Sequence, residues 1–188
     1  KELIETQSQK ILAEAAKQPT EYLKAKYLHD YIIEHASYNS AAADKIDQPS
    51  HLKGKYTVPK EYFSAYSILG FFTRSQIVCS GYAKLFQYLL ARSGMYALYV
   101  TGDSREEGHA WNIVQIDGDY YHFDLTWDDP VSESEEADML RYDYFAVTTA
   151  EIEKDHQLDS LLAYPDCLAE TYHYYRYNNL FLETYDYD

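Results

Sequence analysis

The chain has 188 residues, of which 46% are hydrophobic and 16% aromatic, so it can form one domain with a sizeable core. Its net charge is −15, from 16 basic and 31 acidic residues, and this charge argues against nucleic acid or an anionic membrane surface as a partner, because both would repel it. No stretch approaches the roughly 20 apolar residues of a transmembrane helix.

The first predicted elements are helices. Residues 2–17 carry an amphipathic stripe, and Thr20 can cap a second helix, so residues 1–36 form an N-terminal helical pair. Residues 37–60 have no clear period and contain two prolines and a glycine, which predicts a long loop. A third helix is expected over 61–71.

The rest of the chain alternates helical and strand-like patterns. A helix should begin at or just before Cys79 and end with Gly94 at its C′ position. The other expected elements are strands at 96–102, 109–116 and 120–127, a helix at 149–162, and a hairpin of 172–177 with 180–185. We therefore expect a single domain over 1–188, with its core in 61–188, and the start at Lys1 predicts a longer precursor.

Three residues suggest chemistry: Cys79 in IVCSGYA (77–83), His109 in GHAWN (108–112) and Asp124 in FDLTWDDP (123–130). A thiol, an imidazole and a carboxylate can act as nucleophile, base and orienting group. The start of a helix would stabilise a Cys79 thiolate, and the Cys79 N–H could donate to an oxyanion. Gly81 is expected to keep this first turn uncrowded for a substrate.

A hairpin can bring two of the three together. Asp117-Gly118 is typical of a two-residue turn, which pairs residues whose numbers sum to 235. His109 and Asp124 then lie diagonally on one sheet face, close enough for their side chains to hydrogen-bond. The contact between Cys79 and His109 is long-range, and the pattern alone does not establish it.

These motifs together resemble the bacterial branch of the transglutaminase-like superfamily, over about residues 20–188. The similarity rests on CSGYA (79–83), Gly102, GHAWN (108–112), YHFDLTWDDP (121–130), Tyr38, Tyr144-Phe145, His156, YPDC (164–167) and Tyr174-Tyr175. The resemblance implies a papain-like α+β fold, in which N-terminal helices and a cysteine-bearing helix pack on an antiparallel sheet.

The resemblance also implies a function. Cys79 would be the nucleophile, His109 the base and Asp124 the orienting residue, with no cofactor or metal needed. The substrate would be a glutamine side chain or peptide amide of a protein or peptide, leading to cross-linking onto a primary amine, deamidation or proteolysis. The resemblance favours a bacterial cell envelope or extracellular location, although the residues leave the cytoplasm open.

Candidates for substrate binding or the oxyanion site are Gln76, Trp111 and Trp127. Gln76 is chosen by proximity in sequence, and the tryptophans are expected to pack near the site or to wall the channel for the acyl donor.

Three alternatives stay open at this stage. The domain could be an inactive binding module at the cell surface. Cys79 could form a disulfide with Cys167. His122 alternates with Asp124 and so shares its face, which allows His109, His122 and Asp124 to be interpreted as metal ligands.

Overall fold

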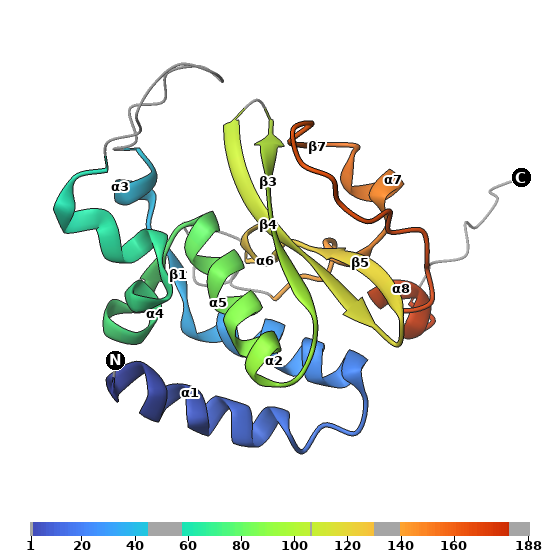
Figure 1. Cartoon of the computed structure of the whole chain (residues 1–188), viewed down its shortest axis with the longest axis horizontal. Helices are drawn as coiled ribbons and strands as arrows, with labels where there is room; N and C mark the ends of the chain where they lie inside the picture. The colour runs from blue at the N-terminus through green and yellow to red at the C-terminus, as the bar shows by residue number, and fades with distance from the viewer. Residues whose placement is uncertain (1, 45–57, 106, 130–139, 181–188) are drawn as a thin grey trace, which may run out of the picture.

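The computed structural model describes residues 2–44, 58–105, 107–129 and 140–180. Its main sheet has five antiparallel strands in the order β6-β5-β4-β3-β7. The strands are β3 (Ala97–Ser104), β4 (Glu107–Ile116), β5 (Asp119–Phe123), β6 (Phe145–Val147) and β7 (His156–Leu158). Separate α-helical and antiparallel β elements confirm the expected α+β class (Figure 1).

Helices cover one face of this sheet. They include α1 (Glu2–Ala15), α2 (Glu21–His35), α4 (Ile68–Arg74) and α5 (Cys79–Arg92). The Thr20 side chain caps α2 by accepting the Leu23 N–H. Gly94 follows α5 with a positive φ of 81°, the left-handed C′ geometry that the sequence predicted.

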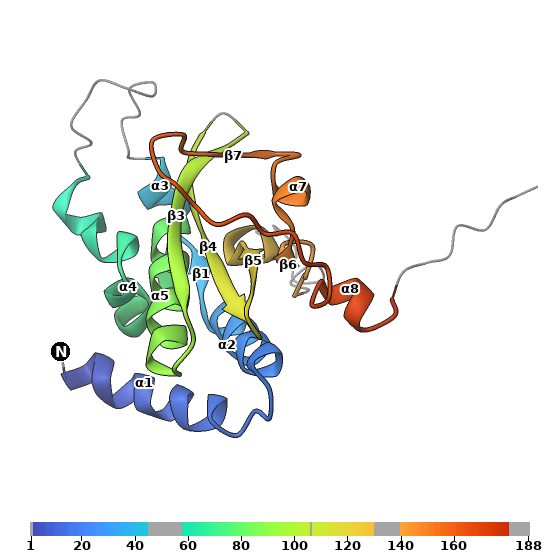
Figure 2. The same ribbon diagram turned by 45° about the vertical axis from the view of Figure 1, so that its right-hand side comes forward.

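The sheet has a hydrophobic core on each side. The helix-side core includes Leu85, Phe86 and Leu89 of α5 against Val114 and Phe123 of the strands. The second core joins buried residues of β3, β4, β6 and α7 (Thr149–Ile152) to the C-terminal segment, and its members are Val100, Trp111, Ile113, Val147, Ile152 and Cys167. In Figure 2, α4 and α5 lie on one side of β3, and the C-terminal segment with α7 lies on the other.

The hairpin between β4 and β5 has the predicted register. Asp117 and Gly118 both have positive φ, 50° and 95°, as a type I′ turn requires. The pairing runs from Ile116↔Asp119 to Asn112↔Phe123. The strand ends there rather than at residue 127, because Asp124 caps the short helix α6 (Leu125–Asp128).

Several expected elements differ in the structure. The predicted loop 37–60 contains β1 (Ser37–Tyr38), which pairs in parallel with β2 (Gln76–Ile77), and α3 (Ser40–Ala43); residues 45–57 lie outside the described ones. The predicted helix 61–71 is divided into a 3₁₀ helix, η1 (Lys60–Tyr66), and α4. Ser67 separates the two, since its extended backbone ends the first and its hydroxyl caps the second.

The C-terminal predictions were also wrong in part. Within 149–162 a capping box at Thr148 starts α7, but the helix lasts one turn and strand β7 follows. Instead of a hairpin strand at 172–177, the chain forms α8 (Tyr174–Tyr177), and 181–188 lie outside the described residues. Among the helices that the structure describes, none is long and apolar enough to cross a membrane.

Candidate active site

Cys79 is the first residue of helix α5. The N–H groups of Gly81 and Tyr82 both donate to the Val78 carbonyl, at 2.7 and 3.1 Å. The N–H groups of Cys79 and Ser80 therefore precede the first intrahelical bonds, at the positive end of the helix dipole. The Cys79 side chain is partly exposed and its thiol is free.

The structure rules out the disulfide alternative, since Cys167 is also a free thiol, fully buried in the second core.

Gly81 has a different role from the one expected. A Cβ at Gly81 would lie 2.6 Å from the Ala65 carbonyl oxygen and 2.7 Å from Ile77 Cβ. The missing side chain thus lets the start of α5 pack against η1 and β2, and it does not make room for a substrate.

His109 and Asp124 are joined by a short hydrogen bond, with 2.6 Å between His109 Nε2 and Asp124 Oδ2. The other carboxylate oxygen, Oδ1, accepts the N–H groups of Thr126 and Trp127 at 3.0 and 3.3 Å. Asp124 is thus fixed as the N-cap of α6 while it binds the imidazole.

The electrostatics of this pair favour an imidazolium beside a carboxylate. Burial lowers the pKa of His109, but the charge and hydrogen bond of Asp124, together with hydrogen bonding and charge from Cys79, raise it to about 10. Burial raises the pKa of Asp124, but His109 and His156 outweigh it and hold that pKa well below its usual range. Cys79 thus influences the same imidazole that Asp124 binds, and Cys79 and His109 line one cleft.

His156 is a member of this site that our reasoning from sequence did not place there. Its Nε2 lies 3.0 Å from Asp124 Oδ2, and its Nδ1 lies 2.6 Å from Asp155 Oδ1. It comes from β7, a strand expected to be helical, and the pairing of β7 with β3 brings it to the site. Two features of the sequence could have indicated His156: its position among the residues that carry the family resemblance, and the carboxylate of the preceding residue, Asp155.

His109, Asp124 and His156 also offer ligand atoms that all lie within 4.8 Å of one another, so these three could hold a metal ion. The structure does not support the set with His122. Its Nδ1 accepts the Trp111 indole N–H at 3.0 Å, and its Nε2 faces the Thr149 hydroxyl at 3.3 Å. Burial lowers the pKa of His122 to about 3, so it is a neutral partner in the core.

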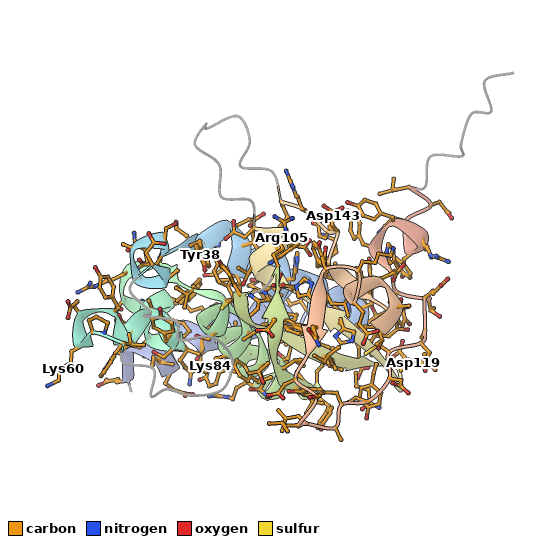
Figure 3. The ribbon with its side chains drawn as sticks, turned by 90° about the horizontal axis from the view of Figure 1, so that it is seen from above. Tyr38, Lys60, Lys84, Arg105, Asp119 and Asp143 are labelled. Atoms are coloured by element: carbon orange, nitrogen blue, oxygen red, sulfur yellow. The ribbon has the colours of Figure 1, made fainter. Side chains whose placement is uncertain are left out.

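Cys79 and His109 open into a cleft of about 750 Å³. Tyr38 and Arg105, both labelled in Figure 3, also line it. The remaining lining residues are Ala43, Asp44, Tyr66, Val78, Ser104, Glu107, Gly108, Thr126, Trp127 and Asp129. The cleft is large enough for a peptide side chain and combines aromatic walls with several carboxylates.

The three substrate or oxyanion candidates are placed differently. Trp127 lines the cleft, with the Arg105 guanidinium 4.5 Å from the centre of its ring. Trp111 is 1% exposed, and its indole N–H is already donated to His122. Gln76 is exposed on β2 and is not among the residues that line the cleft.

Tyr38 enters the cleft through pairing that the sequence did not predict. Strand β1 places Tyr38 beside Ile77, two residues before Cys79. Burial, reinforced by the nearby Cys79, raises the pKa of Tyr38 and raises that of Tyr66 to about 12. Both hydroxyls therefore keep their protons at neutral pH, and that of Tyr66 is donated to the Ala42 carbonyl at 2.7 Å.

The arrangement can carry out nucleophilic acyl chemistry. It supplies a thiol at a helix start, an imidazole that lines the same cleft as the thiol, and a carboxylate that orients the imidazole.

Comparison with known proteins supports the resemblance. The model of the Transglutaminase-like superfamily matches residues 9–125, well over half of the chain. No curated protein matches it.

Two solved structures are similar to parts of this chain. One, described as a TGase, is 23% identical with a TM-score of 0.55, covering 71% of this chain and 33% of its own. Another, described as a "Putative Cysteine Protease from Cytophaga hutchinsonii", is 24% identical with a TM-score of 0.44, covering 64% of this chain and 38% of its own. This chain therefore spans well under half of either solved protein. The family match, the α+β fold and the order of motifs lead to one assignment: the chain belongs to the transglutaminase-like superfamily.

Proposed function

We propose that the protein catalyses cysteine-dependent acyl transfer or hydrolysis on protein or peptide amides. The observation that carries the proposal is the position of His109, which lines the same open cleft as Cys79 and is hydrogen-bonded to Asp124 at 2.6 Å. The nucleophile is Cys79, the base is His109 and the orienting residue is Asp124.

The first half-reaction forms a thioester. His109 takes the thiol proton of Cys79, and the sulfur attacks the carbonyl carbon of a glutamine side chain or peptide amide, while the Cys79 N–H donates to the oxyanion. The C–N bond then breaks, and the imidazolium of His109 gives its proton to the leaving nitrogen, which departs as ammonia or an amine. Asp124 holds Nε2–H of His109, so that Nδ1 is the nitrogen that exchanges the proton.

The second half-reaction resolves the thioester. A primary amine or water attacks the acyl carbon, His109 accepts its proton, and the C–S bond breaks to release the thiolate. An amine yields a cross-linked product, whereas water yields a deamidated or cleaved product. These steps use side chains of this chain alone and need no metal.

The cleft offers Trp127 as a wall for the acyl donor, while Trp111 supports the site from the core. Tyr38 joins the Cys79 N–H as a donor facing the same space. Gln76 would have to move into the cleft to serve the oxyanion. The expected location in the bacterial envelope or outside the cell rests on resemblance and is part of this proposal.

Mass spectrometry of glutamine-containing peptides tests the reaction. Peptides are incubated with the protein, with and without a primary amine. A mass gain matching the amine shows cross-linking, a gain of about one dalton shows deamidation, and shorter peptides show proteolysis. Cys79→Ala should abolish the change, and Cys167→Ala, which removes the other thiol, should retain it.

The competing function is an inactive domain that binds a partner at a cell surface. It predicts unchanged peptides in every arm of the experiment and a Cys79 thiol that reacts no faster than an ordinary one.

A further inference from the structure

Asp124 accepts more hydrogen bonds than a triad requires. Its Oδ1 takes two backbone N–H groups of α6, and its Oδ2 takes both His109 Nε2 at 2.6 Å and His156 Nε2 at 3.0 Å. The backbone bonds hold Oδ1 at the start of α6, and the two histidines hold Oδ2. His156 is the second partner of Oδ2, and it comes from β7, which pairs with β3.

His156 is itself held on every side. Its Nδ1 lies 2.6 Å from Asp155 Oδ1, and the other oxygen of Asp155 accepts the Tyr144 hydroxyl at 2.6 Å. The ring is fully buried, with the ring centres of Trp127, Trp111 and Tyr144 at 4.7, 5.1 and 5.5 Å. A histidine enclosed in this way has one orientation, so it can impose an orientation on the carboxylate that it meets.

We propose that His156 is a positioning residue for the reaction proposed above: it fixes Asp124 Oδ2 against His109, and Asp155 fixes His156. The series Tyr144–Asp155–His156–Asp124–His109 then leads, through hydrogen bonds between neighbours, to the imidazole that shares the cleft with Cys79. This inference depends on the proposed function, because it assigns a role within the same site.

Replacement of His156 can separate this role from simple packing. Gln carries its Nε2 at the same number of bonds from the backbone as histidine does, so His156→Gln keeps the donor to Asp124. Asn is shorter and places its amide nitrogen at the Nδ1 level, so His156→Asn is polar but lacks that donor. His156→Leu fills much of the space and has no donor.

The matched control is His122. It is also fully buried and hydrogen-bonded, and it lies on β5 of the same sheet, but its partners are Trp111 and Thr149. His122→Leu should therefore disturb the core about as much as His156→Leu does, while leaving the bonds of Asp124 in place.

The experiment measures the rate of Cys79 alkylation by iodoacetamide at pH 6.5, with thermal unfolding of each variant, so that it needs no identified substrate. We expect His156→Leu and His156→Asn to slow alkylation about 10-fold or more, since small misplacements of catalytic groups have effects of up to about 100-fold. His156→Gln should stay close to wild type, as should His122→Leu. Where a glutamine peptide is turned over, kcat should fall in the Leu and Asn variants while KM stays unchanged.

The outcomes separate this inference from the proposed function. If Cys79 of the wild type is reactive and the Gln, Asn and Leu variants are alkylated at the wild-type rate, the role of His156 is overturned and the proposed function stands. If the alkylation rate falls equally in His156→Gln and His156→Asn, and in proportion to the loss of thermal stability, His156 is a packing residue only. If Cys79 of the wild type reacts at pH 6.5 no faster than an ordinary exposed thiol, the proposed function fails first.

Discussion

Asp124 binds His109 with one carboxylate oxygen and caps helix α6 with the other. The same side chain therefore ends strand β5, begins α6 and orients the imidazole. Substitution of Asp124 should therefore change both the stability of the fold and the properties of His109, and both changes can be measured.

Asp124→Asn should lower the pKa of His109, because the charge of Asp124 is the largest influence that raises it to about 10. Since that pKa is raised above its ordinary value of 6.5, the stabilisation from the protonated pair is complete below about pH 6.5 and is lost as the pH rises through about 10. The difference in unfolding free energy between wild type and Asp124→Asn should thus shrink from pH 6 to pH 10.

Urea denaturation at the two pH values, with an NMR titration of His109, provides the measurement. A stability difference that does not change between pH 6 and pH 10 would contradict this account of the pair.

Gly102→Ala should destabilise the protein by about 2 kcal/mol or more, as overpacking in a core does. A Cβ at Gly102 would lie 2.0 Å from the Gln157 carbonyl oxygen and 2.8 Å from Trp111 Cη2. The glycine lets β7 approach β3 and so brings His156 to Asp124. Urea denaturation gives the loss of stability, and the alkylation rate of Cys79 should fall with it.

The matched control lies on the neighbouring strand. Gly108 has no atom within 4 Å of the position that a Cβ would take and does not adopt a positive φ. Gly108→Ala should therefore change stability by no more than about 0.5 kcal/mol. Equal losses in the two variants would show that the β3–β7 approach is not what requires glycine at position 102.

Asp128→Ala should destabilise the fold by about 3 kcal/mol, because it breaks a fully buried pair. Asp128 Oδ2 lies 3.1 Å from His29 Nε2, and its Oδ1 accepts the Tyr144 N–H at 2.9 Å. Burial raises the pKa of Asp128 to about 6. Denaturation at pH 7 measures the effect.

The surface pair of Glu5 with Arg92, at 2.8 Å, serves for comparison. Glu5→Ala should have a much smaller effect than Asp128→Ala, because solvent screens an exposed pair. A comparable loss in both variants would contradict the importance that we assign to burial.

The sequence predicted the elements whose signals are local. Thr20 marks the start of α2, and the Asp117-Gly118 turn sets the register that places His109 near Asp124. The same local reasoning put Cys79 at a helix start, which the structure bears out.

The elements that were missed depend on contacts between distant segments. Strand β7 has three residues, too few to show a periodicity, and it exists because it pairs with β3. Strand β1 has two residues and brings Tyr38 to the cleft through β2. His156 and Tyr38 could therefore be noted as motif residues, but their positions followed only from tertiary structure.

The central claim, that Cys79 is an activated nucleophile, can be tested within one molecule. Wild-type protein is treated with iodoacetamide from pH 5 to pH 8, and alkylation of Cys79 and Cys167 is followed by peptide mass spectrometry. Burial raises the pKa of Cys167 to about 12, so it is an internal control. The account predicts rapid alkylation of Cys79 well below pH 8, little alkylation of Cys167, and a clear loss of Cys79 reactivity in His109→Ala. A Cys79 thiol that reacts only near pH 8 and above, with the same rate in His109→Ala, would contradict it.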